Sequence, residues 1–342
     1  MFNDFINLQL FAVLSNGANA TVASGSMGTG AVNADLSPEN KTYYDMTLID
    51  EAQAQLVHDQ FGQKKPIPAN GGKTIEFRKF HSYEKALTPL QEGVTPAGKA
   101  VKVTAITSTV DQYGDYTMLT DVLDLTSIDN VVLETTKIHG RQAGMTLDTV
   151  TRDVLHSGTN VTYCGDGTSR KTLTADDQLT VDVIMQVVAK LRSMNAPTIN
   201  GKYVAIIHPY VAYDLMRDPE WIDAHKYTNV TNLYEGEIGE IAGVRFVQTS
   251  EAKIYTGDSC PSGLAVFGTL FLADGAYGVT EITGGGLQTI VKQKGSAGTA
   301  DPLDQRSTVG WKAIKTAELL VPNYICAIES KSAKWSSKAA AN

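Results

Sequence analysis

The chain contains fragments of several catalytic motifs, but none of them is complete. Residues 72–74 read Gly-Lys-Thr, like the end of a P-loop, whose lysine and hydroxyl hold a nucleotide phosphate and its Mg²⁺. The first glycine of that motif would fall at Ile67, and a strand pattern follows where the motif needs a helix. The glycines of residues 25–30 lack the order and the preceding strand of a dinucleotide fingerprint. Neither Ser26 nor Ser169 lies in a G-x-S-x-G nucleophile elbow.

The histidines and carboxylates have no spacing that would build a metal site or an acid–base pair. The six histidines never recur at a zinc-ligand spacing such as H-E-x-x-H. His208 is the most suggestive, because it ends a strand pattern just before a helix, but Pro209 favours a helix start that His208 caps. The pairs Asp176–Asp177 and Glu235/Glu237 are typical of solvated faces or helix starts. We therefore expect no enzyme, no catalytic residue, no cofactor and no metal.

Composition and charge narrow the function classes further. With 342 residues, 42% of them hydrophobic, the chain is long enough for two compact lobes. A formal net charge of −8 argues against a protein that grips nucleic acid through its own surface. Three cysteines without C-x-x-C spacing predict neither disulfides nor a zinc site, and they suit a reducing cytoplasm. No stretch reaches the roughly 18 apolar residues of a membrane span, and the first basic residue, Lys41, comes too late for a secretory signal.

The spacing of apolar residues predicts a mixture of helices and strands. Helical spacing is found over residues 43–61, 128–156, 180–194 and 209–216. Strand patterns are found over residues 203–207, 244–248, 264–267, 287–292, 309–321 and 324–328. Gly140 and Gly144 interrupt the longest helix, so we expect a bend or a close helix contact there. This mixture predicts an α+β fold.

A long two-stranded ribbon is the strongest sign of assembly in the sequence. A strand pattern runs from Thr74 towards Leu87, turns at residues 89–98 and returns along residues 99–112, where the apolar phase slips. At about 3.3 Å per residue, the return strand would span on the order of 45 Å. Such a ribbon is marginal in water unless something covers it. The cover is either another lobe of the same chain or a neighbouring copy.

Three stretches together resemble the major capsid proteins of tailed phages. Leu90 to Asp121 has an EG-x-TP turn, a long Thr/Val strand and QYG-x-Y before LTD, similar to the extended loop of that family. Glu235 to Ala252 resembles its short helix, Gly turn and strand, and Asp301 to Ile328 joins a polar turn to two β runs. The resemblance covers residues 43–331 and is closest to the phage N-four-like branch of the Hong Kong 97-type fold.

The resemblance implies a Hong Kong 97-like α+β capsid fold with an extended β-hairpin loop, a long spine helix and mixed sheets. It divides the chain into an N-terminal arm (1–41), a peripheral domain (42–74, 121–179 and 301–331), an extended loop (75–120), an axial domain (180–300) and a C-terminal tail (332–342). It also implies that copies form the pentamers and hexamers of an icosahedral shell around viral double-stranded DNA. The Gly- and Ser-rich arm equally fits a disordered tail on its composition alone.

In this reading the functional residues lie at interfaces. The candidates, at the loop tip and in the polar turn, are Glu92, Gly93, Thr95, Pro96, Asp301, Gln305 and Arg306. Arg306 can pair bidentately with a carboxylate of its own lobe or of a neighbour. The implied partners are further copies, a scaffolding protein, portal and decoration proteins, and packaged DNA held without sequence-specific contacts, with no membrane involved. The implied location is the virion capsid, after assembly in the host cytoplasm.

Two other function classes stay open on the sequence. A cellular compartment shell of the encapsulin type or a surface-layer protein would assemble in the same way, and charge and periodicity do not separate them from a viral shell. An enzyme with an unrecognised α+β fold would need a cleft with displaced pKa values and would stay a small oligomer. Some capsids of the family that this chain resembles join their subunits covalently through a Lys–Asn isopeptide bond. The extended loop of this chain has lysines, but no acceptor asparagine can be matched, so we expect no such crosslink.

Overall fold

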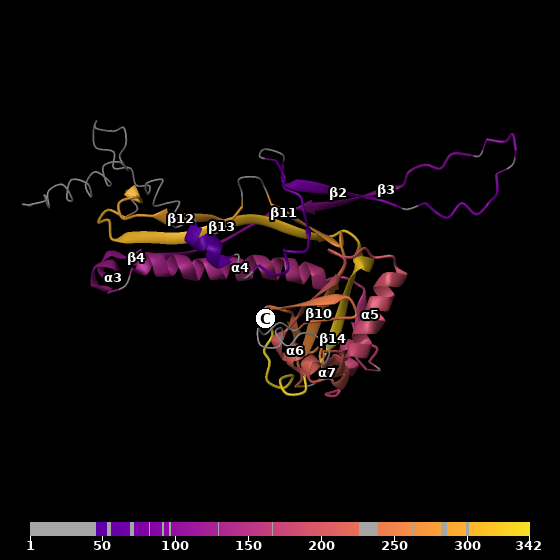
Figure 1. Cartoon of the computed structure of the whole chain (residues 1–342). Coiled ribbons are helices and arrows are strands. Elements are labelled where there is room, and N and C mark those ends of the chain that lie inside the picture. The colour runs from indigo at the N-terminus through magenta and orange to yellow at the C-terminus, as the bar shows by residue number, and fades with distance from the viewer. Residues whose placement is uncertain are drawn as a thin grey trace, which may run out of the picture. The chain divides into compact units, whose positions relative to one another are not determined.

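The computed structural model describes residues 46–342 except 53–55, 69–71, 82, 91, 96, 129, 166, 226–238, 262, 282–285 and 299–300. The predicted arm (1–41), Pro96 and the start of the motif at Glu235 therefore lie outside the described residues. The chain forms two compact units. Among the described residues, the first contains the chain from Met46 to Leu56 with Gln112–Leu147 and Gly284–Ile314, and the second contains Val57–Asp111, Asp148–Thr283 and Lys315–Asn342. Figure 1 labels their elements.

The first unit is built on one long helix and one long strand. The helix is α4 (Val131–His156) and the strand is β13 (Arg306–Leu319), and each continues into the second unit. β13 pairs antiparallel with β12 (Gln288–Lys292) and also pairs with β4 (Asp111–Thr120), which leads into the short helix α3 (Asp121–Thr126). The core of this unit contains Leu48, Ala143, Leu147, Trp311 and Ala313.

Glycines allow the backbones of the first unit to approach closely. A Cβ atom on Gly140 would lie 2.8 Å from the Leu48 carbonyl oxygen, so the helix over residues 46–52 contacts α4 at this point. The close helix contact expected at Gly140 is therefore confirmed. A Cβ on Gly310 would lie 2.8 Å from the Asp115 carbonyl oxygen, so β4 and β13 make a similar contact.

The second unit contains a seven-stranded mixed sheet with strand order β5-β14-β10-β6-β8-β7 and β9 paired to β10. The strands are β5 (Val161–Tyr163), β6 (Tyr203–Ile207), β7 (Glu240–Ile241), β8 (Val244–Gln248), β9 (Ile254–Tyr255), β10 (Val266–Leu272) and β14 (Ile325–Ser330). The helices are α5 (Val181–Ser193), α6 (Pro209–Met216) and α7 (Pro219–His225). The buried residues of α5 share one core with β6 and β10. β1 (Gln63–Lys64) pairs with β11 (Tyr277–Glu281), and β11 pairs with the end of β13.

Several predicted elements are confirmed, and the differences have local causes. The strands over 203–207 and 244–248 and the helix over 209–216 are found as predicted. The helix predicted over 43–61 is shorter, because the chain turns at residues 58–61. From its residue type and position, Thr180 is expected to cap α5. This expectation is wrong, because the Thr180 side chain makes no cap bond and the Asp218 carboxylate accepts the Val181 N–H at 3.0 Å instead.

The long return strand is two strands rather than one. β3 (Val103–Thr109) pairs with β2 (Thr74–Phe80), and β4 starts two residues later and pairs with β13. Between them Val110 is buried, and its N–H donates to the Lys73 carbonyl. The phase slip in the sequence therefore marks a change of strand partner.

We predict that Gly140→Ala lowers the free energy of unfolding. The added methyl group gains roughly 1 kcal/mol of helix propensity, but overpacking against a backbone carbonyl costs about 1–3 kcal/mol. Thermal denaturation measures the result. The control is Gly98→Ala, where an added Cβ meets no atom within 4 Å. A Gly140→Ala protein with a raised melting temperature contradicts the close contact.

His208 gives α6 a cap that depends on pH. Its Nδ1 accepts the Tyr210 N–H at 3.1 Å, as expected for a histidine before Pro209, and this requires a neutral ring. Burial lowers the pKa of His208 from 6.5 to about 4. The folded pKa lies below the unfolded value, so its stabilising contribution is complete above pH 6.5 and is lost as the pH falls through about 4.

We predict that His208→Asn flattens the acid side of the stability profile. Asparagine is a good cap that does not titrate, so the variant should lose less unfolding free energy than the wild type between pH 6.5 and 4. Burial also lowers the pKa of His156 in the same direction, but both proteins retain that group. Chemical denaturation at several pH values measures the difference. Parallel profiles would contradict the assignment.

Candidate functional site

The β2–β3 ribbon is anchored at one end and uncovered at the other. At its base, Ile75 and Phe77 are buried, and the Ser108 and Thr316 hydroxyls lie 3.0 Å apart. A Cβ on Gly278 would lie 2.7 Å from the Phe77 ring, so only glycine leaves room for this ring. The ladder ends at the pair Phe80 and Val103. The hairpin continues beyond the labelled strands as a long loop (Figure 1).

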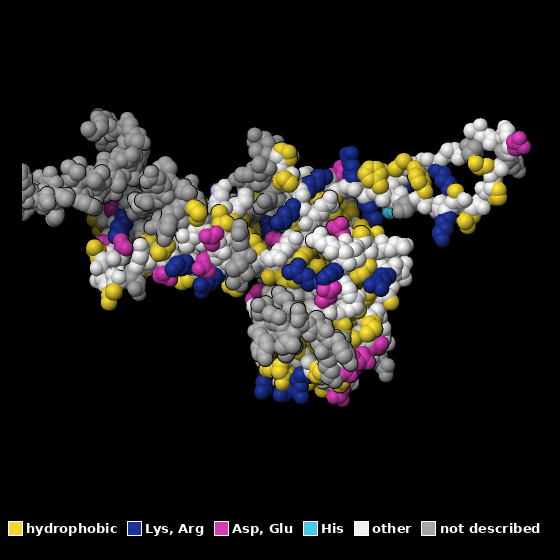
Figure 2. All heavy atoms as spheres, viewed as in Figure 1, with side chains coloured by type: hydrophobic (Ala, Val, Ile, Leu, Met, Phe, Trp, Pro, Cys, Tyr) yellow, Lys and Arg dark blue, Asp and Glu magenta, His cyan; other side chains and the backbone are white. Residues whose placement is uncertain are grey.

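Beyond the ladder the ribbon exposes apolar side chains. They include Phe80 (68%), Tyr83 (57%), Leu87 (83%), Leu90 (78%) and Val101 (61%). Figure 2 shows hydrophobic side chains along this part of the ribbon. Exposed apolar clusters of this kind mark interaction surfaces. In the described part of the chain, no other strand pairs with β2 or β3.

The predicted tip residues lie at the far end of this ribbon. Glu92 and Gly93 form a turn and are exposed, and Thr95 is exposed beside them. Gly93 has φ +77°, a backbone conformation that residues other than glycine adopt only at a cost in free energy. Pro96 lies outside the described residues. Their part in an interface stays a prediction.

The polar turn of residues 301–306 belongs to the first unit. Asp301 is buried, and its Oδ2 accepts the Arg306 N–H at 2.8 Å. The Gln305 carbonyl accepts the Asp121 N–H at 3.0 Å, which ties the turn to the start of α3. The Arg306 Nε lies 3.9 Å from Asp301 Oδ1, and within the described residues its guanidinium makes no bidentate pair. Asp301 therefore shapes the turn, and the guanidinium of Arg306 is exposed.

An apolar surface on α3 was missed by sequence reasoning. No residue of α3 is buried, and the exposed fractions are 63% for Val122, 79% for Leu125 and 102% for Ile128 just after it. Leu303 in the polar turn is 75% exposed. A six-residue helix without a buried face is unstable alone. The Val-Leu-Asp-Leu run of the sequence is the signal that could have revealed it.

Several buried ionisable groups are tied into the structure rather than held ready for chemistry. The Asp148 carboxylate accepts the N–H groups of Val57 and His58 and lies 2.6 Å from His58 Nδ1. Burial raises the pKa of the Cys164 thiol to about 12, which keeps it protonated. Among the described residues there is no group of three side chains that could hold a metal ion. Within the same part of the chain, every helix is too short or too polar to cross a bilayer.

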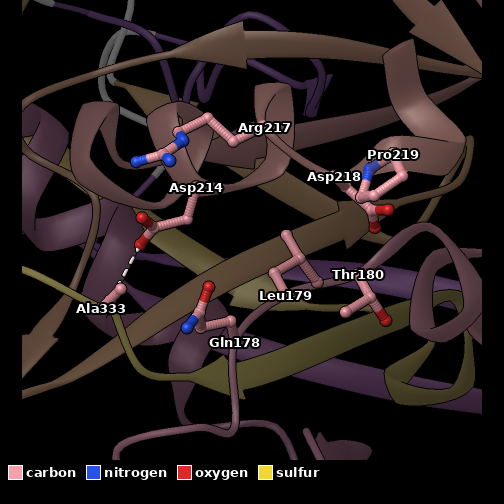
Figure 3. Close-up of a pocket in the computed structure, with 8 residues that line it drawn as sticks. All are labelled: Gln178, Leu179, Thr180, Asp214, Arg217, Asp218, Pro219 and Ala333. Atoms are coloured by element: carbon pink, nitrogen blue, oxygen red, sulfur yellow. Dashed lines mark hydrogen bonds between the residues drawn. The ribbon is translucent and has the colours of Figure 1, made fainter.

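A cavity of about 440 Å³ lies between the residues just before α5, the end of α6 and the tail, and the carboxylates that line it already have partners. Figure 3 shows Asp214 turned towards Ala333, and its Oδ2 accepts the Ser332 hydroxyl and the Ala333 N–H. Asp218 accepts the N–H groups of Val181 and Glu220. These carboxylates cap backbone groups, so this cavity does not supply an acid–base pair.

Comparison with known proteins decides the family. A family model described as phage capsid protein matches residues 103–328, more than half of the chain. The chain belongs to the phage capsid protein family. It is thus a capsid shell protein, and the family and the fold point to a structural, non-enzymatic role. No curated protein sequence matches it.

Solved capsids share the fold at low sequence identity. The capsid of cyanophage Pam1 is 12% identical with a TM-score of 0.66, and the match covers 91% of this chain and 100% of that one. The capsid of Ralstonia phage GP4 is 13% identical with a TM-score of 0.63, and the match covers 90% of this chain and 96% of that one. The capsid of cyanophage P-SCSP1u is 13% identical, covers 81% and 88%, and also has a TM-score of 0.63. The predicted α+β Hong Kong 97-like fold is confirmed.

We predict that Asp301→Ala destabilises the polar turn and that Arg306→Ala does not. Asp301→Ala removes a buried acceptor and should lower the free energy of unfolding by about 1–3 kcal/mol. Arg306→Ala removes an exposed side chain and should change it by less than roughly 0.5 kcal/mol. Thermal denaturation of both variants measures the difference. Equal losses in the two would mean that the Arg306 guanidinium also holds the turn.

Proposed function

We propose that copies of this chain form the pentamers and hexamers of an icosahedral shell that encloses a viral double-stranded DNA genome. The observation that carries the proposal is the ribbon, whose Tyr83, Leu87 and Leu90 side chains stay in water in a single copy. Burying apolar area is worth roughly 25 cal/mol per Å², so a neighbour that covers the ribbon stabilises both copies. Family membership supports a neighbour of the same kind.

The proposed assembly takes place in the host cytoplasm and ends in the virion. The two exposed apolar surfaces, on the ribbon and on α3, provide contacts in addition to the predicted N-terminal arm. Individually weak contacts suit a closed shell, because closure multiplies them. A scaffolding protein, a portal and decoration proteins are further proposed partners, and the DNA is enclosed without sequence-specific contacts.

Electron microscopy and light scattering of the full chain expressed in cytoplasm test the proposal. Closed particles, tubes or capsomer rings support it. If the chain alone stays a monomer or dimer, co-expression with a candidate scaffold must restore particles, and continued failure refutes the proposal. A cargo enzyme in place of DNA in the native particles would instead favour a cellular compartment shell.

We predict that Leu87→Ser with Leu90→Ser strongly reduces the particle yield and leaves the fold intact. Both side chains are at least 78% exposed, so the melting temperature of the single chain should not change. Particle yield by negative-stain microscopy should fall at least tenfold. The matched control is Met185→Ser with Ile222→Ser, two exposed apolar residues of α5 and α7. Normal particles from the ribbon variant would remove the ribbon from the interface.

A further inference from the structure

Two cations meet at one tyrosine on the surface of the second unit. The guanidinium carbon of Arg217 lies 5.6 Å from the centroid of the Tyr213 ring, and Lys334 Nζ lies 5.6 Å from the same centroid. The Arg217 Nη1 donates to the Tyr213 hydroxyl at 3.3 Å. Both cationic residues are exposed, and neither forms an ion pair with a carboxylate in the described part of the chain. We call Tyr213, Arg217 and Lys334 the phenol cluster.

The phenol cluster is held in place by the packing behind it. Trp335 follows Lys334 in the chain, stacks on Tyr210 with a centroid distance of 4.7 Å, and meets Tyr213 edge to face at 5.0 Å. The turn that carries these residues is fixed on one side by the Ser332 hydroxyl on Asp214 and on the other by the Ser336 carbonyl, which accepts the Ala265 N–H at 2.6 Å. The backbone that carries Arg217 and Lys334 is therefore held in place by packing and hydrogen bonds.

Within the described residues, the nearby carboxylates form no ion pair with the cluster. Asp214 and Asp218 line the cavity beside Arg217, but each accepts two hydrogen bonds from backbone or hydroxyl donors. Figure 3 shows the Arg217 side chain extended away from Asp218. The bonds from Arg217 and then from Lys334 lower the pKa of the Tyr213 hydroxyl, which reflects the positive field at this point. Two like charges beside one hydroxyl attract an oxyanion.

We propose that the phenol cluster binds phosphate groups of nucleic acid, a role that rests on the proposed enclosure of DNA. Arginine and lysine on one face with a tyrosine hydroxyl are typical donors to phosphate oxygens. Its two cations are exposed, whereas the Tyr213 ring already contacts Trp335 and carries both cations, so the cluster offers phosphate contacts rather than base stacking or an apolar anchor for a protein. The net charge of −8 does not prevent this, because exposed charges are screened beyond about 8–10 Å at physiological salt.

Fluorescence anisotropy with a labelled 30-base-pair duplex tests the proposal on the full chain. The variant is Arg217→Gln with Lys334→Gln, and the control is Lys64→Gln with Lys171→Gln, two exposed lysines outside the cluster. At about 50 mM salt the variant should bind at least tenfold more weakly. The slope of log K against log salt concentration should become less steep by roughly 0.9 for each of the two lost phosphate contacts. The control should bind like the wild type. Tyr213→Phe, which keeps the ring, should show a smaller loss.

Three results would overturn the proposal. They are no duplex binding by the wild type at about 50 mM salt, equal losses in variant and control, and displacement of DNA by polyglutamate of the same charge, which would identify an acidic protein as the partner. Particle formation is measured on the same preparations. Variant particles that form normally and bind DNA weakly support the proposal, whereas failure of every protein to form particles concerns the shell and not this cluster.

Discussion

Within the described residues, the two-stranded ribbon has no other layer of the same chain packed over its outer end, and the proposed assembly of the protein depends on this constraint. Apolar side chains such as Leu87 and Leu90 can leave water only if another surface packs on them. The base of the ribbon solves the same problem locally, because Phe77 lies against Gly278. The second unit therefore holds the ribbon firmly at one end and leaves the other end for a partner. For a member of the phage capsid family, that partner is most simply another copy.

Several buried or partly buried charges have a different task, because they connect parts of the chain that are distant in sequence. Arg170 donates two hydrogen bonds to the Glu329 carboxylate, at 2.7 and 2.5 Å, and its guanidinium lies 3.5 Å from the centroid of the Tyr255 ring. Asp59 accepts the Thr151 hydroxyl and pairs with Lys315. Buried charges persist in proteins when they are paired and hydrogen-bonded. This explains how a chain with many ionisable residues in its interior can serve a structural role.

The local surface charge at the phenol cluster differs in sign from the net charge of the chain. The chain as a whole is acidic, whereas Arg217 and Lys334 meet at Tyr213 without a carboxylate partner in the described residues. Local clusters act within a Debye length, so an acidic protein can still offer a basic contact. The conclusion that net charge argues against nucleic-acid binding therefore applies to the whole surface and not to each part of it.

The sequence by itself determined the fold class, the family resemblance and the elements with strong periodicity. Residues 203–207, 244–248 and 209–216 could be predicted because their apolar spacing or Pro209 start is a local property of the chain. Only the tertiary structure decided that the strand pattern breaks at Val110, that Asp218 caps α5 in place of Thr180, and that Asp301 faces its own turn. The first two outcomes depend on contacts between residues far apart in the chain, and the third depends on how one side chain is oriented within its own turn. Apolar spacing encodes neither.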